Sequence, residues 1–158
     1  MKAFVVLGMC ASLLLVACGP SPSSRSAPPA SVETPPAVVA HPGKQLLRMN
    51  CYLCHYPGAE SPDLLTAPPL GEIKYHYLAA YPEKDAFVQA MLAFLKDSRS
   101  ENAIMQAAVK RYGPMAQVPA SEADLWQMVT YLYEEAVEVP DWFPAYFEET
   151  YEKSWSDQ

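Results

Sequence analysis

The chain has 158 residues and a formal net charge of −7 at pH 7, and 51% of its residues are hydrophobic. The residues from 39 onward are numerous enough to bury one hydrophobic core. The negative charge makes nucleic acid an unfavourable partner, because binding to phosphates depends on basic side chains. Length and charge therefore predict one small globular domain that does not bind nucleic acid.

The first residues are predicted to be a secretory signal peptide. Lys2 supplies a positive charge, and residues 3–16 form an apolar run that is too short to span a bilayer comfortably. Residues 15–19 read LVACG, which resembles the lipobox of bacterial lipoproteins. The resemblance implies cleavage before Cys18 and attachment of a diacylglycerol to its thiol. An ordinary signal peptide with an incidental cysteine is the alternative.

The lipoprotein interpretation places the protein on the periplasmic side of a bacterial membrane. Residues 1–17 are the expected signal peptide, and Cys10 would leave with it. Lipidation at Cys18 would anchor the mature chain, since two or more acyl chains give durable membrane binding whereas one gives marginal binding. Gly19 stands where an aspartate commonly retains lipoproteins in the inner membrane, so the outer membrane is favoured.

The lipidated N-terminus is expected to continue as a tether over residues 18–38. This segment is rich in Pro, Ser and Ala and shows no hydrophobic period. Such a composition buries too little apolar surface to offset the entropy lost on ordering. We predict a semi-extended tether that lets the domain move between membrane partners; a plain spacer is the alternative.

Residues 51–55 read CYLCH, and the spacing C-x-x-C-H is the attachment signature of one covalent haem c. In this interpretation Cys51 and Cys54 add to the two vinyl groups of the porphyrin, and His55 binds the iron. Two alternatives are a thioredoxin-like redox pair and a zinc site. The first belongs to a βαβ pattern, and this chain has almost no strand signal. The second needs four ligands, and the chain has no second C-x-x-C or H-x-x-x-H.

Helical patterns dominate the residues after the tether. Apolar residues recur at helical spacing in four runs, at 39–50, 87–95, 104–109 and 125–132. Pro82 suits the first turn of the second run, while Gly113 and Pro114 end the third. Ser121 with Asp124 predicts a capping box at the start of the fourth. No alternating strand of useful length is present, so the predicted class is all-α.

Residues 39–135 resemble the class I c-type cytochromes. In that family a glycine eight residues before the first cysteine lets the first and last helices cross closely, and Gly43 stands eight before Cys51. Leu47 departs from the aromatic residue usually found four before that cysteine, which suggests a different packing contact at the crossing. The resemblance implies a class I cytochrome c-like helical fold around one covalently bound haem.

The last predicted helix carries a second part of the resemblance. The family's last helix often reads L-x-x-Y-L, and residues 128–132 read MVTYL. Gly43 would remove a side chain where Tyr131 and Met128 need room. A generic helix would leave Gly43 unexplained, because glycine weakens a helix interior by about 1 kcal/mol.

The segment 67–71 reads APPLG and follows His55 by about a dozen residues. In the family a proline there turns its carbonyl toward the ring N–H of the proximal histidine. Pro68 is the candidate, because Pro68 and Leu70 match the family's Pro-x-Leu. Such an acceptor would fix the tautomer of the imidazole and raise its basicity toward iron.

Met115 is the candidate for the sixth iron ligand. It follows Gly113-Pro114 in an irregular loop between two helical runs, and its separation from His55 is close to the family's usual one, although Ala116 replaces the usual following proline. The other downstream methionines, which fall in helical patterns where methionine usually fills the core, are Met91, Met105 and Met128. His76 is the rival ligand, expected in a packed loop or short helix, and His41 is expected to be solvent-exposed.

Iron held by His55 and Met115 would have both axial positions filled by protein, and the methionine would raise the reduction potential. One-electron transfer between redox partners is then the expected function, rather than enzyme catalysis. One alternative is a haem enzyme or ligand sensor in which Met115 dissociates. Another is a fixed haem subunit of a larger oxidoreductase.

Residues 136–158 form a predicted aromatic and acidic extension. Pro140 and Pro144 are expected to make a break, and residues 145–155 to form one more amphipathic helix. In the plainer interpretation the aromatic side chains pack onto the haem domain while the carboxylates face water. In the functional alternative the carboxylates form a docking surface for a redox partner with a basic face, since opposite charges speed encounter.

Overall fold

The structure, a computed structural model, describes residues 41–157. The helices are α1 (Pro42–Asn50), α2 (Leu70–Ala80), α3 (Lys84–Lys96), α4 (Gln106–Tyr112), α5 (Glu122–Glu134) and α6 (Phe143–Tyr151), with three short 3-10 helices, η1 (Pro62–Leu64), η2 (Ser100–Asn102) and η3 (Trp155–Asp157). Residues 41–157 contain no strand, and none of their helices has the length and apolar character needed to cross a membrane. The predicted all-α class is confirmed. The signal peptide, Cys18 and the tether lie outside the described residues.

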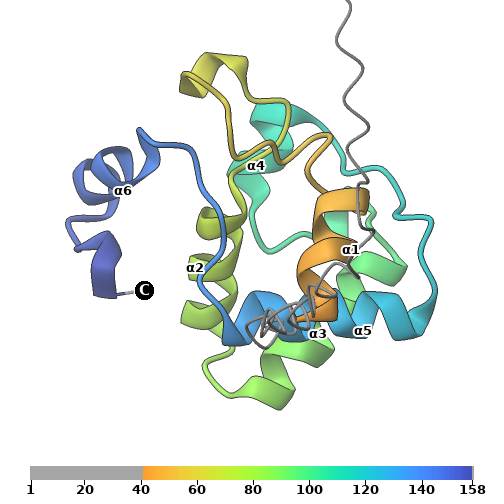
Figure 1. Cartoon of the computed structure of the whole chain (residues 1–158). Helices are drawn as coiled ribbons and strands as arrows, with labels where there is room; N and C mark the ends of the chain where they lie inside the picture. Colours follow the sequence, from red (N-terminus) through yellow and green to blue (C-terminus); the bar gives the residue numbers. More distant parts are fainter. Residues whose placement is uncertain (1–40, 158) are drawn as a thin grey trace, which may run out of the picture. The chain divides into compact units, whose positions relative to one another are not determined.

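α1 packs across α5 (Figure 1). Gly43 is buried at this crossing, where a Cβ atom would lie 2.2 Å from the carbonyl oxygen of Gln127 and 2.6 Å from Cβ of Tyr131. These distances are far below van der Waals contact, so only glycine lets the two backbones approach this closely. The close crossing predicted from Gly43 is confirmed, although the second contact is Gln127 rather than Met128.

His41 caps the start of α1. Its Nδ1 accepts a hydrogen bond from the backbone N–H of Gly43 at 3.1 Å, and its Nε2 lies 3.5 Å from a carboxylate oxygen of Glu134. Pro42 occupies the first turn, where its missing N–H costs nothing. The prediction of an exposed His41 was therefore wrong: the ring is half-buried because it bonds to the helix that it starts.

α3 and α5 together contribute half of the buried apolar side chains of the described residues. The residues that they bury against one another and against neighbouring helices include Phe87, Val88, Met91 and Leu92 of α3 and Leu125, Met128, Val129 and Leu132 of α5. Ser121 Oγ accepts from the N–H of Asp124 at 3.2 Å, as the capping prediction requires. Pro82 differs from expectation, since α3 begins only at Lys84 and the carbonyl of Pro82 accepts from Tyr133 Oη at 3.1 Å.

α2 is a complete helix of 11 residues, where the sequence predicted only a packed loop or short helix. Its side chains contact structure on more than one side. Ile73 and Tyr77 line a central cavity, and Tyr75 and His76 contact Tyr151 of the C-terminal extension. A helix covered on opposite sides has no single apolar stripe, so its period is hidden in the sequence.

Lys74 joins α2 to the end of α5. Its side chain is 9% exposed, and Nζ donates a hydrogen bond to the carbonyl of Glu135 at 2.8 Å. This carbonyl follows the last turn of α5, where a cation meets the negative end of the helix dipole. Burial lowers the pKa of Lys74, and the nearby Glu135 opposes that shift.

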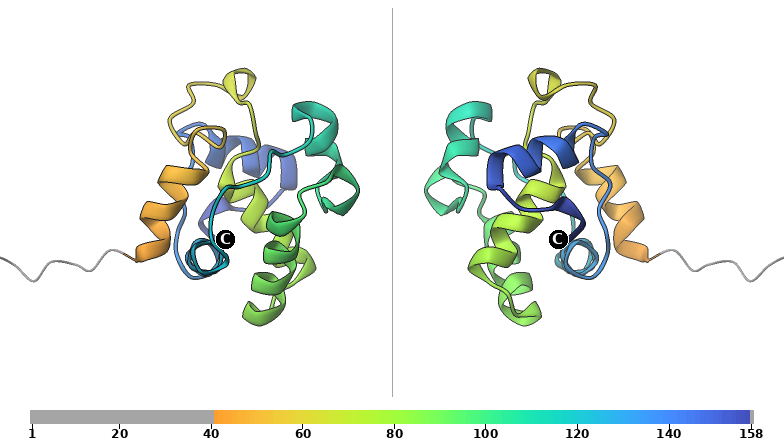
Figure 2. Two further views of the ribbon diagram at one scale, coloured as in Figure 1. Left: turned by 90° about the vertical axis from the view of Figure 1, so that its right-hand side faces the viewer. Right: turned by 90° about the vertical axis from the view of Figure 1, so that its left-hand side faces the viewer.

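Figure 2 shows α6 of the C-terminal extension beside α2. Aromatic rings form the contact between them. Phe143 and Phe147 are fully buried, and the rings of Phe147 and Tyr75 meet edge-on with centroids 4.9 Å apart. A Cβ atom at Gly71 would lie 2.6 Å from the ring of Trp155, so α2 and the extension are in tight contact. The glutamates of α6 are exposed. The plainer interpretation, with buried aromatics and solvated carboxylates, is confirmed.

The ends of α6 differ from the predicted helix over 145–155. Pro144 lies in the first turn of α6 and so helps to start the helix instead of breaking it. The helix ends at Tyr151, because Glu152 adopts a left-handed conformation with φ of 54°. The chain then turns into η3, which brings Trp155 back onto Phe143, with ring centroids 5.0 Å apart.

Candidate functional site

A cavity of about 440 Å³ lies among α1 to α5 and the loops that join them. Its lining is mostly apolar and includes Leu47, Leu70, Ile73, Tyr77, Met91, Phe94, Leu95, Val109, Val118, Met128, Val129 and Leu132. The volume falls in the range of about 300–1,000 Å³ that is usual for small-molecule and cofactor sites. The domain therefore has room for a large apolar group in its interior.

Cys51, Cys54 and His55 form one wall of this cavity. They follow α1 in a tight turn, in which the N–H of His55 donates to the carbonyl of Cys51 at 2.9 Å. Cys51 is half-buried, Cys54 is exposed and His55 is buried, and both thiols are free. Thr66 Oγ1 donates to the carbonyl of Cys54 at 3.2 Å and ties the turn to the following loop. The turn presents two thiols and one imidazole to the same space.

His55 Nδ1 lies 2.7 Å from the carbonyl oxygen of Pro68. Burial lowers the pKa of His55, and the hydrogen bond to Pro68 partly opposes that shift. The neutral ring is thus the favoured form, with Nδ1–H donating to Pro68 and the lone pair of Nε2 left available. A neutral imidazole oriented by a carbonyl acceptor is the usual state of a histidine that binds a metal.

The thiol of Cys51 is held in its protonated form by burial, which raises its pKa to about 11. Within residues 41–157 no group of three or more His, Cys, Asp or Glu side chains is placed to hold a metal ion. A zinc site built from Cys51, Cys54 and His55 would therefore lack further ligands of the usual types. Covalent use of the two thiols fits this geometry better.

Met115 lines the cavity from the loop between α4 and α5 and is half-buried. The loop begins at Gly113, whose φ of 85° ends α4 in a conformation that favours glycine. Met91 and Met128 also line the cavity, but from the buried faces of α3 and α5, as expected. Met105 was predicted to lie within a helix and instead immediately precedes α4, because α4 starts at Gln106, two residues after the apolar run at 104–109 begins.

His76 does not line the cavity. Its Nε2 lies 3.0 Å from the hydroxyl of Tyr151, which in turn donates to a carboxylate oxygen of Glu72 at 2.9 Å. This network faces the C-terminal extension. His55 is the one histidine among the described residues that line the cavity.

Ser98 lines the cavity and was not predicted from the sequence as a site residue. Its Oγ donates to the carbonyl of Met115 at 3.1 Å. A lone serine after a helix belongs to no motif, so only the folded structure reveals the contact. Leu53 was also not predicted as a site residue. It lines the cavity at its mouth and is 89% exposed.

The family model described as cytochrome c matches residues 40–134. No curated protein and no solved structure matches the chain. Members of the matched family bind haem c covalently. The matched region contains Pro68, Met115 and the turn from Cys51 to His55, called the attachment turn below. The residues present fit that group: one wall offers two free thiols and a neutral imidazole, the Met115 loop lines the same cavity, and the rest of the lining is apolar.

Proposed function

The chain belongs to the cytochrome c family, and on this premise we propose that it carries single electrons between redox partners through a haem ligated by His55 and Met115. When bound, the haem supplies a one-electron couple. Cys51 and Cys54 would hold it covalently. The cavity keeps water from its faces, while the exposed Cys54 and Leu53 mark the edge that a partner can approach. The protein thus acts as a carrier and not as an enzyme.

One observation carries this proposal: the attachment turn and the Met115 loop, far apart in sequence, line the same cavity. His55 Nε2 is available on one wall because Nδ1 is bound to Pro68. Met115 offers a thioether from an irregular loop, which can cross the face of a flat group more closely than a helix axis can. With His55 and Met115 both bound to the iron, the haem would have no vacancy for oxygen or substrate, and the site would exchange electrons.

Replacing Met115 with alanine is expected to abolish the methionine–iron charge-transfer band at the red end of the oxidised spectrum. The low-spin features should also be lost, because alanine offers the iron no ligand atom. Met105→Ala is the matched control, since Met105 also lines the cavity beside α4 but is not a proposed ligand. A band that survives in Met115→Ala and disappears in Met105→Ala would assign the ligand to Met105. A low-spin spectrum that lacks the band in the wild type, and that is lost in His76→Ala, would assign the ligand to His76.

We propose that the mature protein is anchored to the periplasmic side of a bacterial membrane, in the outer membrane where there are two, through lipid on Cys18. The support is the LVACG sequence at residues 15–19, which lies outside the described residues. Extraction from membranes by detergent but not by salt tests the anchor, and Cys18→Ser should release the protein. Stoichiometric co-purification with a larger oxidoreductase would favour the fixed-subunit alternative.

The proposed redox partner has a basic face. Glu149 and Glu152 of the extension are exposed, and the whole chain has a formal net charge of −7. Opposite charges raise the encounter rate of two proteins. At 0.1 M salt this attraction is largely screened beyond about 10 Å. The carboxylates of the extension are therefore the candidate docking groups.

We expect Glu149→Gln/Glu152→Gln to slow electron transfer to a small basic redox protein by roughly threefold at low salt. The rate constant is measured by stopped flow, and the difference should vanish at high salt. Glu83→Gln/Asp85→Asn is the control, because it removes the same charge from exposed positions at the start of α3. Equal slowing in both variants would show that net charge, and not the extension, attracts the partner.

A further inference from the structure

The loop that carries Met115 is attached to the rest of the domain at few points. Residues 113–120 cross from α4 to α5 without forming a helix, and in the described chain no backbone–backbone hydrogen bond joins residues 114–117 to another element. Two side-chain hydrogen bonds connect this loop to the end of α3. Ser98 Oγ donates to the carbonyl of Met115 at 3.1 Å, and Gln117 Nε2 donates to the carbonyl of Leu95 at 2.6 Å.

The two hydrogen bonds differ in their surroundings. Ser98 is 8% exposed, whereas Gln117 is an exposed side chain. Water competes less for the partly buried hydrogen bond from Ser98 than for the exposed one from Gln117, so the bond from Ser98 contributes more. The bond from Ser98 also ends on the backbone of Met115 itself. The hydrogen bond from Ser98 is therefore the contact that most directly fixes the backbone position of Met115.

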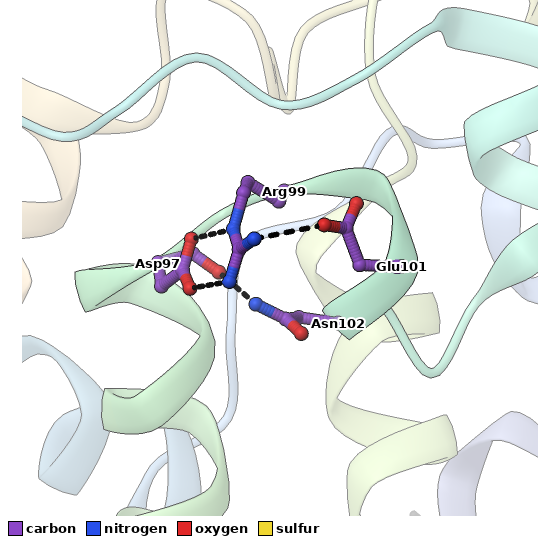
Figure 3. A network of polar contacts seen from close by, with 4 residues as sticks. All are labelled: Asp97, Arg99, Glu101 and Asn102. Carbon is purple, nitrogen blue, oxygen red and sulfur yellow. Dashed lines mark hydrogen bonds and ion pairs between the residues drawn. The ribbon is translucent and has the colours of Figure 1, made fainter.

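The turn after α3 that contains Ser98 also carries a polar network, which Figure 3 shows for Asp97, Arg99, Glu101 and Asn102. Arg99 Nε donates to a carboxylate oxygen of Asp97 at 2.7 Å, and Arg99 Nη1 lies 3.0 Å from a carboxylate oxygen of Glu101. Asn102 Nδ2 donates to the carbonyl of Asp97 at 3.0 Å and closes the turn. These contacts join residues on both sides of Ser98, so they restrain the turn from which its hydroxyl is presented.

We propose that Ser98 is a positioning residue that keeps the Met115 thioether on the iron by holding the backbone of Met115. The inference rests on the proposed function, because it takes Met115 as the sixth ligand. The protein has a closed form, with the thioether bound, and an open form, with the loop displaced. The hydrogen bond from Ser98 exists in the closed form alone, so its loss shifts the population toward the open form.

The test measures how well added imidazole replaces Met115 in the oxidised full-length holoprotein. Imidazole binds only the open form, so its apparent affinity follows the open fraction. Ser98→Ala should raise this affinity about fivefold, the effect of losing one partly buried neutral hydrogen bond. Ser98→Thr keeps the hydroxyl and should restore the wild-type affinity. The methionine–iron band, followed in the same titration, reports the ligand that leaves.

Thr66→Val is a control on the attachment side of the cavity. It removes a hydroxyl that also donates to a backbone carbonyl beside the cavity, that of Cys54, but on the attachment side. Its imidazole affinity should stay at the wild-type value. Asn102→Ala provides a second route, because it loosens the turn that carries Ser98 without touching the hydroxyl. We expect a smaller rise in imidazole affinity, in the same direction as for Ser98→Ala.

The inference is overturned if Ser98→Ala binds imidazole within about twofold of the wild-type affinity, or if Thr66→Val shows the same rise. Either result, with a wild-type protein that has the methionine–iron band, would leave the proposed function intact. A wild-type protein without the band, unchanged by Met115→Ala, would instead show that Met115 is not a ligand. The two failures are thus distinguished by the wild-type spectrum.

Discussion

Gly43→Val is expected to lower the free energy of unfolding by about 3 kcal/mol or more, at or above the top of the usual range for overpacked cores. The added Cβ would lie 2.2 Å from the backbone carbonyl oxygen of Gln127 and 2.6 Å from Cβ of Tyr131. Neither atom can move by a side-chain rotation, so α1 and α5 would have to separate. Denaturant unfolding of the holoprotein, followed by circular dichroism, measures the loss.

Gly58→Ala is the matched control for Gly43→Val. A Cβ atom at Gly58 would meet only the ring of Tyr56, at 2.7 Å, and that ring is 57% exposed and free to turn away. We expect this substitution to change the stability by less than about 1 kcal/mol. If Gly43→Val lowered the free energy of unfolding no more than Gly58→Ala, the close approach of α1 and α5 at Gly43 would be contradicted.

Phe143→Ala is expected to cost about 3–5 kcal/mol of the free energy of unfolding, as for other large buried rings. Phe143 is fully buried, and its ring centroid lies 5.0 Å from that of Trp155 and 5.9 Å from that of Phe147. Truncation would leave a cavity under α6 and remove the contact between the Phe143 ring and Gly71 of α2. The C-terminal extension would then count as part of the folding unit. Denaturant unfolding of the holoprotein measures the change.

Glu149→Ala tests whether the effect of Phe143→Ala depends on the buried face of α6. Glu149 is exposed on the same helix, and its loss should change stability by no more than about 0.5 kcal/mol. A cost below about 1 kcal/mol for Phe143→Ala would contradict the packing. It would indicate that the extension separates from the domain without unfolding it.

Sequence predicted best those features that are encoded by neighbouring residues. The cap at Ser121 needs only the spacing to Asp124, and the attachment turn from Cys51 to His55 is contiguous. The crossing at Gly43 was predicted through the family resemblance, because a glycine inside a helix is costly unless another backbone comes close. The partner at that crossing, Gln127, could not be named, because a helix face alone does not fix the register of the helix that packs on it.

Features that depend on contacts between distant segments were missed. α2 is covered from two directions, so its apolar residues do not form one stripe, and it was not predicted as a complete helix. Met105 was placed inside a helix because the apolar pattern continues smoothly through the residue before α4. The hydrogen bond from Ser98 to Met115 joins two loops and leaves no trace in the sequence.

The structure, and not the sequence, shows how the histidine side chains lie relative to the cavity. Sequence named Pro68 through the resemblance, and the structure puts its carbonyl oxygen 2.7 Å from Nδ1 of His55. Sequence could not exclude His76 as a cavity residue, whereas the structure bonds it to Tyr151 of the extension. Side-chain direction decided both points, and it depends on packing that no single element determines.

The most direct test of the whole account is the exposure of the fully reduced full-length holoprotein to carbon monoxide. With His55 and Met115 both bound to iron, the visible spectrum is predicted to stay that of the reduced protein at saturating gas. Rapid formation of a stoichiometric carbon monoxide adduct would contradict the account. The iron would then have an open position, and the site would serve ligand binding or catalysis instead of electron transfer alone.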